Sequence, residues 1–162
     1  MSTPGYNAVR ARDLGRALAA ARGGHWEYVL GHAASSGWTE GVAALLQVDG
    51  REVRDRMVGA ASTPEIFEML RKRYKGPPSP VWLEFAAGDG NIAMVRHVWP
   101  LVQDTGQSFF TAVSEGKFEC ASVLFSLMGG NIVTGGSVYT NGLSGVMSTR
   151  SSTCVAVSWQ RA

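Results

Sequence analysis

The sequence of this 162-residue chain predicts an all-α protein in which about four short helical hairpins stack side by side. Two observations predict this fold class. Alanine pairs return at offsets of 26 to 27 residues, each with a large apolar residue three positions earlier, and glycine-containing turns interrupt the chain every dozen or so residues. Because a hairpin of about 26 residues cannot bury its apolar faces alone, stacked copies forming an α-solenoid are the expected arrangement.

The composition favours one globular domain and excludes several classes of protein. Hydrophobic residues make up 45% of the chain, charged residues 17%, and the net charge is only +2, unlike a disordered acidic chain or a strongly basic nucleic-acid binder. The two cysteines, Cys120 and Cys154, form no CxxC pair, which supports neither a disulfide-rich secreted fold nor a structural zinc site. No apolar run approaches the ~20 residues of a membrane-spanning helix, so we expect no membrane insertion.

The N-terminal segment, residues 1–24, is predicted to hold a capping helix over Val9 to Ala21, with the helical pairs beginning at His25. A rival frame pairs the first two helices and leaves residues 38–47 without a partner. Basic residues between Arg10 and Arg22 fall where a secretory signal needs apolar ones, which favours an intracellular, cytoplasmic protein. The same basic helix leaves organellar import as the alternative.

The repeats occupy residues 25–128 and share features at matching positions. The paired small residues are Ala33-Ala34, Ala60-Ala61, Ala86-Ala87 and Ala112-Val113, and the preceding apolar residues, expected to be buried, are Leu30, Met57, Leu83 and Phe109. Turn glycines recur at Gly37, Gly90 and Gly116, and carboxylates that suit a helix start recur at Glu40, Glu65 and Glu119. Ser62 with Glu65 is expected to form a capping box around Pro64.

The stretch from Ala20 to Val29, AARGGHWEYV, resembles the ankyrin repeat, and residues 85–95 and 111–123 are similar in weaker form. The resemblance covers roughly residues 11–128 and implies stacked helical hairpins that bind partners through a surface. Ankyrin repeats run to ~33 residues and carry a threonine-proline-leucine-histidine motif, whereas the units here are shorter and lack that motif. We therefore expect the projecting β-hairpin fingers of that family to be reduced or absent.

No local motif predicts catalysis. The segment from Gly88 to Ala93 fits the GxGxxG/A dinucleotide pattern, but it occupies the same place as the turns at Gly37 and Gly116 and is better explained as a turn. His25 and His32 lack the further ligands that a metal site needs. We therefore expect no catalytic residues, cofactor or metal, and predict that the protein is not an enzyme.

The predicted function is a protein–protein interaction or scaffold role within a larger, hetero-oligomeric assembly. Two variable positions on the first helix of each hairpin are expected to contact the partner: Tyr28, Asp55, Val81 and Gln107 at one, with Val29, Arg56, Trp82 and Ser108 at the next. Arg56 and Trp82 are the strongest candidates because Trp and Arg dominate interface energetics. The alternative is that Trp82 belongs to the core.

A basic cluster suggests a second function. It consists of Arg51, Arg54, Arg71, Lys72, Arg73 and Lys75. Cations at the end of a helix suit its dipole, which is the favoured explanation of the last four. The alternative is an anion patch that contacts RNA or an acidic protein surface, with Tyr74 available for stacking, so an RNA- or anion-contacting accessory subunit is the second functional hypothesis.

The tail, residues 129–162, is rich in Gly, Ser and Thr, and all 13 acidic residues precede it. Residues 137–140 and 153–159 have β-like character, with Asn141-Gly142 as a hairpin turn. We expect a partner-facing arm with Trp159 as its apolar anchor. The alternative is a tail that caps the last helical pair.

Overall fold

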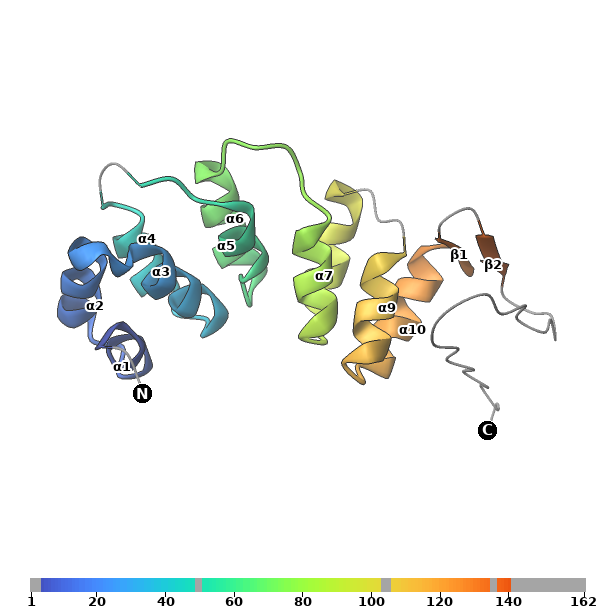
Figure 1. The fold of residues 1–162 in the computed structure, drawn as a ribbon, viewed down its shortest axis with the longest axis horizontal. Helices are drawn as coiled ribbons and strands as arrows, with labels where there is room; N and C mark the ends of the chain where they lie inside the picture. Colours follow the sequence, from blue (N-terminus) through green and yellow to red (C-terminus); the bar gives the residue numbers. More distant parts are fainter. Residues whose placement is uncertain (1–3, 49–50, 103–105, 135–136, 141–162) are drawn as a thin grey trace.

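The computed structural model describes residues 4–48, 51–102, 106–134 and 137–140. Its body is all-helical, as predicted, and the helices follow one another along a curved, elongated row (Figure 1). In chain order they are α1 (Pro4–Arg10), α2 (Leu14–Ala20), the π-helical turn η1 (Ala21–His25), α3 (Trp26–Ser35), α4 (Thr39–Leu45), α5 (Asp55–Gly59), α6 (Pro64–Arg73), α7 (Val81–Gly88), α8 (Ile92–Val98), the 3-10 turn η2 (Trp99–Leu101), α9 (Gln107–Ser114) and α10 (Phe118–Leu127).

The helices pack as pairs in two rows. Each odd-numbered helix contacts the even-numbered helix that follows it, and these pairs stack so that α1, α3, α5, α7 and α9 form one row, here called the first helices. The even-numbered helices α2 to α10 form the second row. Three of the four apolar residues expected in the core, Leu30, Met57 and Leu83, are buried, whereas Phe109 is only partly buried.

Side-chain hydrogen bonds and ion pairs link the pair α3–α4 to α5–α6, and α5–α6 to α7–α8, at offsets of 27 to 29 residues. The Ser62 hydroxyl donates to the Ala34 carbonyl at 2.9 Å, and the Asn91 amide donates to the Ser62 carbonyl at 2.8 Å. Arg54 with Glu27, Arg73 with the Leu46 carbonyl, and His97 with Glu68 make the corresponding links elsewhere. These offsets are close to the 26 to 27 residues that separate the alanine pairs, so the sequence period reflects the spacing between neighbouring helix pairs.

The turns at Gly37, Gly90 and Gly116 share one backbone conformation, with φ of +72°, +71° and +70°. Each is closed by a hydrogen bond from the residue after the glycine to a carbonyl five residues earlier, as in a Schellman motif. A left-handed φ favours glycine because other residues carry a Cβ that clashes there. The prediction that Gly88 to Ala93 contains a turn is confirmed, since α7 is a helix rather than the strand that a dinucleotide site requires.

The N-terminal segment differs from its prediction. The sequence predicts one helix over Val9 to Ala21, but the structure has two helices, α1 and α2, which pack as a pair. Arg12, whose φ is +52°, separates them. Asp13 explains the break because its side chain caps α2, accepting a 3.0 Å hydrogen bond from the Arg16 N–H. Gly5 lets α1 approach α3 closely, because a Cβ at Gly5 would lie 2.8 Å from the Val29 side chain.

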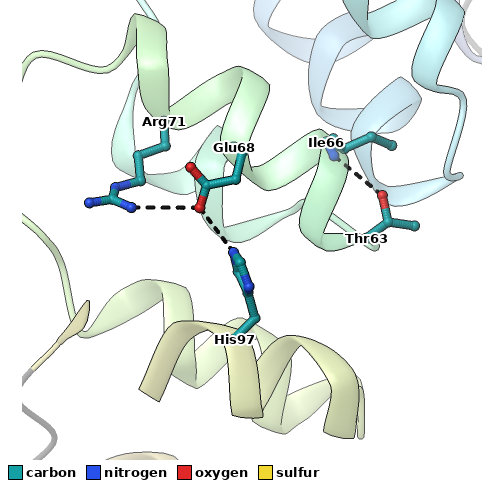
Figure 2. Close-up of polar contacts among 5 residues, drawn as sticks. All are labelled: Thr63, Ile66, Glu68, Arg71 and His97. Carbon is teal, nitrogen blue, oxygen red and sulfur yellow. Dashed lines mark hydrogen bonds and ion pairs between the residues drawn. The ribbon is translucent and has the colours of Figure 1, made fainter. Parts of the chain in front are cut away.

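The capping of α6 also differs from its prediction. Thr63, not Ser62, is the N-cap, and its hydroxyl accepts a 3.3 Å hydrogen bond from the Ile66 N–H (Figure 2). Ser62 instead uses its hydroxyl in the link to the preceding pair. The three carboxylates expected near helix starts, Glu40, Glu65 and Glu119, all lie in the first turn of their helices.

A short antiparallel hairpin follows α10. Its strands are β1 (Asn131–Thr134) and β2 (Ser137–Thr140), with the Ile132 and Tyr139 backbones paired. The β-like character predicted for residues 137–140 is confirmed, although the partner strand precedes this segment instead of following an Asn141-Gly142 turn. That turn, residues 153–159 and the Trp159 anchor lie outside the described residues.

Candidate interaction surfaces

The structure divides the predicted partner-binding positions between surface and core. Tyr28, Arg56 and Gln107 are exposed, and Asp55 and Val81 are half-buried. In contrast, Val29 and Ser108 are 0% exposed and Trp82 is 1% exposed. The expectation that these last three present their side chains to a partner is therefore wrong.

Trp82 is buried because it joins an aromatic cluster between α6 and α7. Its ring meets Phe67 edge to face at 5.4 Å between centroids and meets Tyr74 at 5.5 Å. The indole N–H has no hydrogen-bond acceptor among the described residues. Edge-to-face packing against two rings favours burial of the indole, whereas its buried N–H without an acceptor costs free energy.

A different set of exposed aromatic residues lies on the first helices. Its members, here called the aromatic face, are Tyr6, Tyr28, Phe85 and Phe110, which are 37% to 43% exposed and come from α1, α3, α7 and α9. The other large exposed apolar residues in the described part of the chain, Phe118 and Leu127, lie on α10, the last helix. Among the described residues, α2, α4, α6 and α8 expose no comparable side chain.

Contacts with neighbouring first helices hold parts of this face in place. The His32 ring lies between two tyrosines, with centroid distances of 5.2 Å to Tyr6 and 4.3 Å to Tyr28, both edge to face. Phe85 lies over Gly59 of α5, where a Cβ would be 3.1 Å from the ring. The sequence contained a signal for the place of Phe85 on this face. His32 lies one helical turn after Tyr28 in α3, and Phe85 stands in α7 at the repeat position that His32 occupies in α3.

The structure brings together three of the six residues of the basic cluster, Arg54, Arg73 and Lys75. A parallel β-bridge between Val53 and Tyr74 places the segment before α5 beside the end of α6. Next to this bridge is a pocket of about 300 Å³, lined by Glu52, Val53, Arg54, Asp55, Arg73, Tyr74, Lys75 and Gly76. Two acidic side chains thus share the pocket with three basic ones.

Most cations of the cluster are already engaged. Arg54 pairs with Glu27 at 3.1 Å, Lys75 pairs with Glu52 at 3.2 Å, and Arg71 lies 3.6 Å from Glu68. Arg73 donates a 2.9 Å hydrogen bond to the Leu46 carbonyl. Arg51 and Lys72 are exposed. A phosphate would have to compete with nearby carboxylates, so the local charge favours it only weakly.

The most concentrated polar contact joins α6 and α8 at Glu68 (Figure 2). One carboxylate oxygen of Glu68 lies 2.9 Å from His97 Nε2 and 3.6 Å from the Arg71 guanidinium. The His97 ring also meets Phe67 edge to face at 5.5 Å. This arrangement links the helix pair that contains α6 to the pair that contains α8.

The described residues contain no group of three or more His, Cys, Asp or Glu side chains that could hold a metal ion. The Cys120 thiol is buried in α10, and its pKa is raised first by loss of hydration and then by the nearby Glu119 carboxylate. In the part of the chain that the structure describes, no helix has the length and apolar character needed to cross a membrane.

No protein-family model, curated protein or solved structure matches the chain at a significant level.

Proposed function

We propose that this protein is a non-catalytic interaction module that binds a partner protein along its aromatic face, within an ankyrin-like α-solenoid. The observation that carries the proposal is the concentration of exposed aromatic side chains on the first helices. Isolated exposed apolar residues are ordinary on soluble proteins, whereas Tyr6 and Tyr28 both contact the His32 ring and so form a patch across two helices, as interaction sites do. Tyrosine in particular is enriched among the residues that dominate binding energy.

The helix arrangement supports the solenoid part of the proposal. Two rows of helices, the links at 27 to 29 residues and three equivalent glycine turns are what a stack of repeated units requires. The isolated bridge between Val53 and Tyr74 stands where a longer projecting hairpin would stand in ankyrin repeats. This agrees with fingers that are reduced.

The test compares wild type with two variants. Tyr28→Ser combined with Phe85→Ser removes two rings of the aromatic face from different helices. Phe118→Ser is the matched control, because Phe118 is 54% exposed but lies on α10. Each protein is first checked for an unchanged melting temperature.

Partners captured from source cells by wild type are identified by mass spectrometry, and their affinities are then measured with purified components. We expect at least a tenfold weaker affinity for the double variant, since each buried tyrosine or phenylalanine anchor contributes about 1–2 kcal/mol or more. The Phe118→Ser control should bind like wild type. Equal binding by the double variant would rule out the aromatic face as the site.

The basic cluster supports a second candidate function, contact with RNA or another anion, because three of its residues, Arg54, Arg73 and Lys75, line one pocket beside the bridge between Val53 and Tyr74. Binding of a single-stranded RNA should then weaken steeply as salt increases, and Arg51→Ala with Lys72→Ala should reduce that salt dependence. RNA affinity that is absent at low salt would exclude this function.

A further inference from the structure

The last helix pair, α9 and α10, ends the stack. The first helices α3, α5 and α7 each contact a first helix on either side, whereas α9 contacts α7 alone among the first helices. Figure 1 shows α9 and α10 at the end of the row, and the short β1–β2 hairpin is the one described element that follows them. Within the described residues, the outer side of this pair therefore faces no further helix.

The rotation of α9 identifies the side chains on this outer side. The Thr111 methyl group faces α7, because it lies 3.4 Å from the place that a Cβ would take at Gly88. Phe109 lies two residues before Thr111, about 200° around a helix of 3.6 residues per turn. Its ring therefore points away from α7. It meets the Phe125 ring of α10, with 6.1 Å between the centroids.

Four apolar residues share the outer side of the last pair and are here called the end face. They are Phe109 and Val113 of α9, and Phe118 and Phe125 of α10. Val113 lies one helical turn after Phe109, and Phe118 lies two turns before Phe125, so each pair of residues occupies one face of its helix. Phe118 is 54% exposed, and the other three are half-buried.

The earlier pairs bury the residues that correspond to the end face. The residues at the repeat position of Phe109 are all buried, and they are Leu30, Met57 and Leu83. The residues at the repeat position of Val113 are buried alanines, and they are Ala34, Ala61 and Ala87. Because Val113 adds two methyl groups where stacked pairs have alanine, a further helix pair would be overpacked there. An extended segment needs no such close approach between helices.

We propose that residues 153–159 of this same chain cover the end face as an intramolecular cap. Their sequence, TCVAVSW, places large apolar side chains at every second position, at Val155, Val157 and Trp159. This alternation predicts a strand with one apolar face. The end of a repeat array needs a cover for its apolar surface, and these three side chains are of the kind that the end face would bury.

The connection is long enough for residues 153–159 to reach the end face. Twelve residues separate Thr140, the last residue of β2, from Thr153, and an extended chain of that length spans about 40 Å. The ten residues of α10 rise only about 15 Å. A short flexible tether also holds a segment at a millimolar effective concentration, which favours the chain's own segment over a separate molecule. The inference does not depend on the proposed function of the aromatic face.

Cross-linking within the full chain tests the cap. Cys154 lies in the proposed cap, and Cys120→Ala removes the other thiol while keeping a small apolar side chain in the core. Ser122→Cys then places a thiol on α10 between the two phenylalanines of the end face. Ser114→Cys is the matched control, because Ser114 is exposed like Ser122 but lies about 140° around α9 from Phe109. A short bismaleimide should link Cys154 to position 122 at least tenfold faster than to position 114.

A second pair of variants removes side chains from the tail. Val157→Ser combined with Trp159→Ser should slow the cross-link to position 122 at least fivefold. Val146→Ser with Met147→Ser is the control, because it removes two apolar side chains of the same tail outside the cap, and it should react within twofold of the unaltered tail. Circular dichroism melts establish that every variant remains folded.

Three results would overturn the proposal. The first is an equal rate at positions 114 and 122, or no cross-link at either position, which would leave the end face to a separate partner. The second is a product of doubled mass as the main species, which would place the segment on a second copy of the chain. The third is an equal loss of cross-linking in the Val146→Ser with Met147→Ser control.

Discussion

Replacing Asn91 by aspartate removes one contact between neighbouring helix pairs and leaves a helix cap in place. The Asn91 Oδ1 accepts a 3.1 Å hydrogen bond from the Met94 N–H at the start of α8, and a carboxylate accepts the same bond. The Asn91 Nδ2 donates at 2.8 Å to the Ser62 carbonyl of the preceding pair, and an ionised aspartate has no hydrogen to donate. The substitution therefore tests stacking separately from capping.

We expect Asn91→Asp to lower the free energy of unfolding by about 1–2 kcal/mol. Removing the donor from the half-buried Ser62 carbonyl costs about 1–3 kcal/mol. The new charge at the N-terminus of α8 returns about 0.3–1 kcal/mol through the helix dipole. For a chain of this size the net loss corresponds to a melting temperature about 2–8 °C lower.

Urea unfolding, followed by circular dichroism and tryptophan fluorescence, measures the change. Asn91→Ala loses the cap as well and should fall about 1 kcal/mol further. Thr63→Ala loses only the cap of α6, bonded at 3.3 Å to the Ile66 N–H, and gives the magnitude of capping alone. An Asn91→Asp variant as stable as wild type would show that the contact with Ser62 is not formed.

Three further predictions use the same unfolding assay or a thiol probe. Ala86→Leu overpacks the seam between first helices, where Ala86 is buried, and should cost about 1–3 kcal/mol; unchanged stability would contradict close packing there. Gly116→Ala should cost about 1–2 kcal/mol from the left-handed backbone alone, and Gly90→Ala, which also meets a lysine side chain, at least as much; a neutral Gly116→Ala would refute the shared turn geometry. In a Cys154→Ser background, Cys120 should react slowly with a disulfide reagent near pH 7, because its raised pKa keeps it protonated, and faster as pH rises; immediate labelling at pH 7 would contradict its burial.

The spacing of the stack could be predicted because its signals are local and repeated. A left-handed φ favours glycine at the turn. Glycines that recur at matching positions, here Gly37, Gly90 and Gly116, therefore reveal equivalent turns in the sequence. The N-terminal pair was missed for a different reason. The helical spacing of apolar residues continues through Arg12, so the sequence pattern shows no interruption. The helix is interrupted because Asp13 caps the start of α2 and does not continue α1.

The candidate site could be predicted only in part, because burial depends on how each helix is rotated against its neighbours. Tyr28 is exposed in α3, but the next position along the first helices is buried at Trp82 and Ser108. Adjacent helical positions differ by about 100°, since there are 3.6 residues per turn, and that rotation separates surface from core. Arg56 remains exposed at the same position in the short helix α5.

Stability and the proposed binding rest on different side chains. The links between helix pairs use turn residues such as Ser62 and Asn91, whereas the exposed Tyr28 ring lies edge to face with the His32 ring of its own helix. Replacing Tyr28 therefore removes exposed surface and little packing, while replacing Asn91 removes a contact that holds two pairs together. If the aromatic face binds a partner, Tyr28→Ser should lose affinity at unchanged stability, and Asn91→Asp should lose stability in the free protein. A Tyr28→Ser variant that unfolds as readily as Asn91→Asp would mean that the aromatic face serves the fold itself.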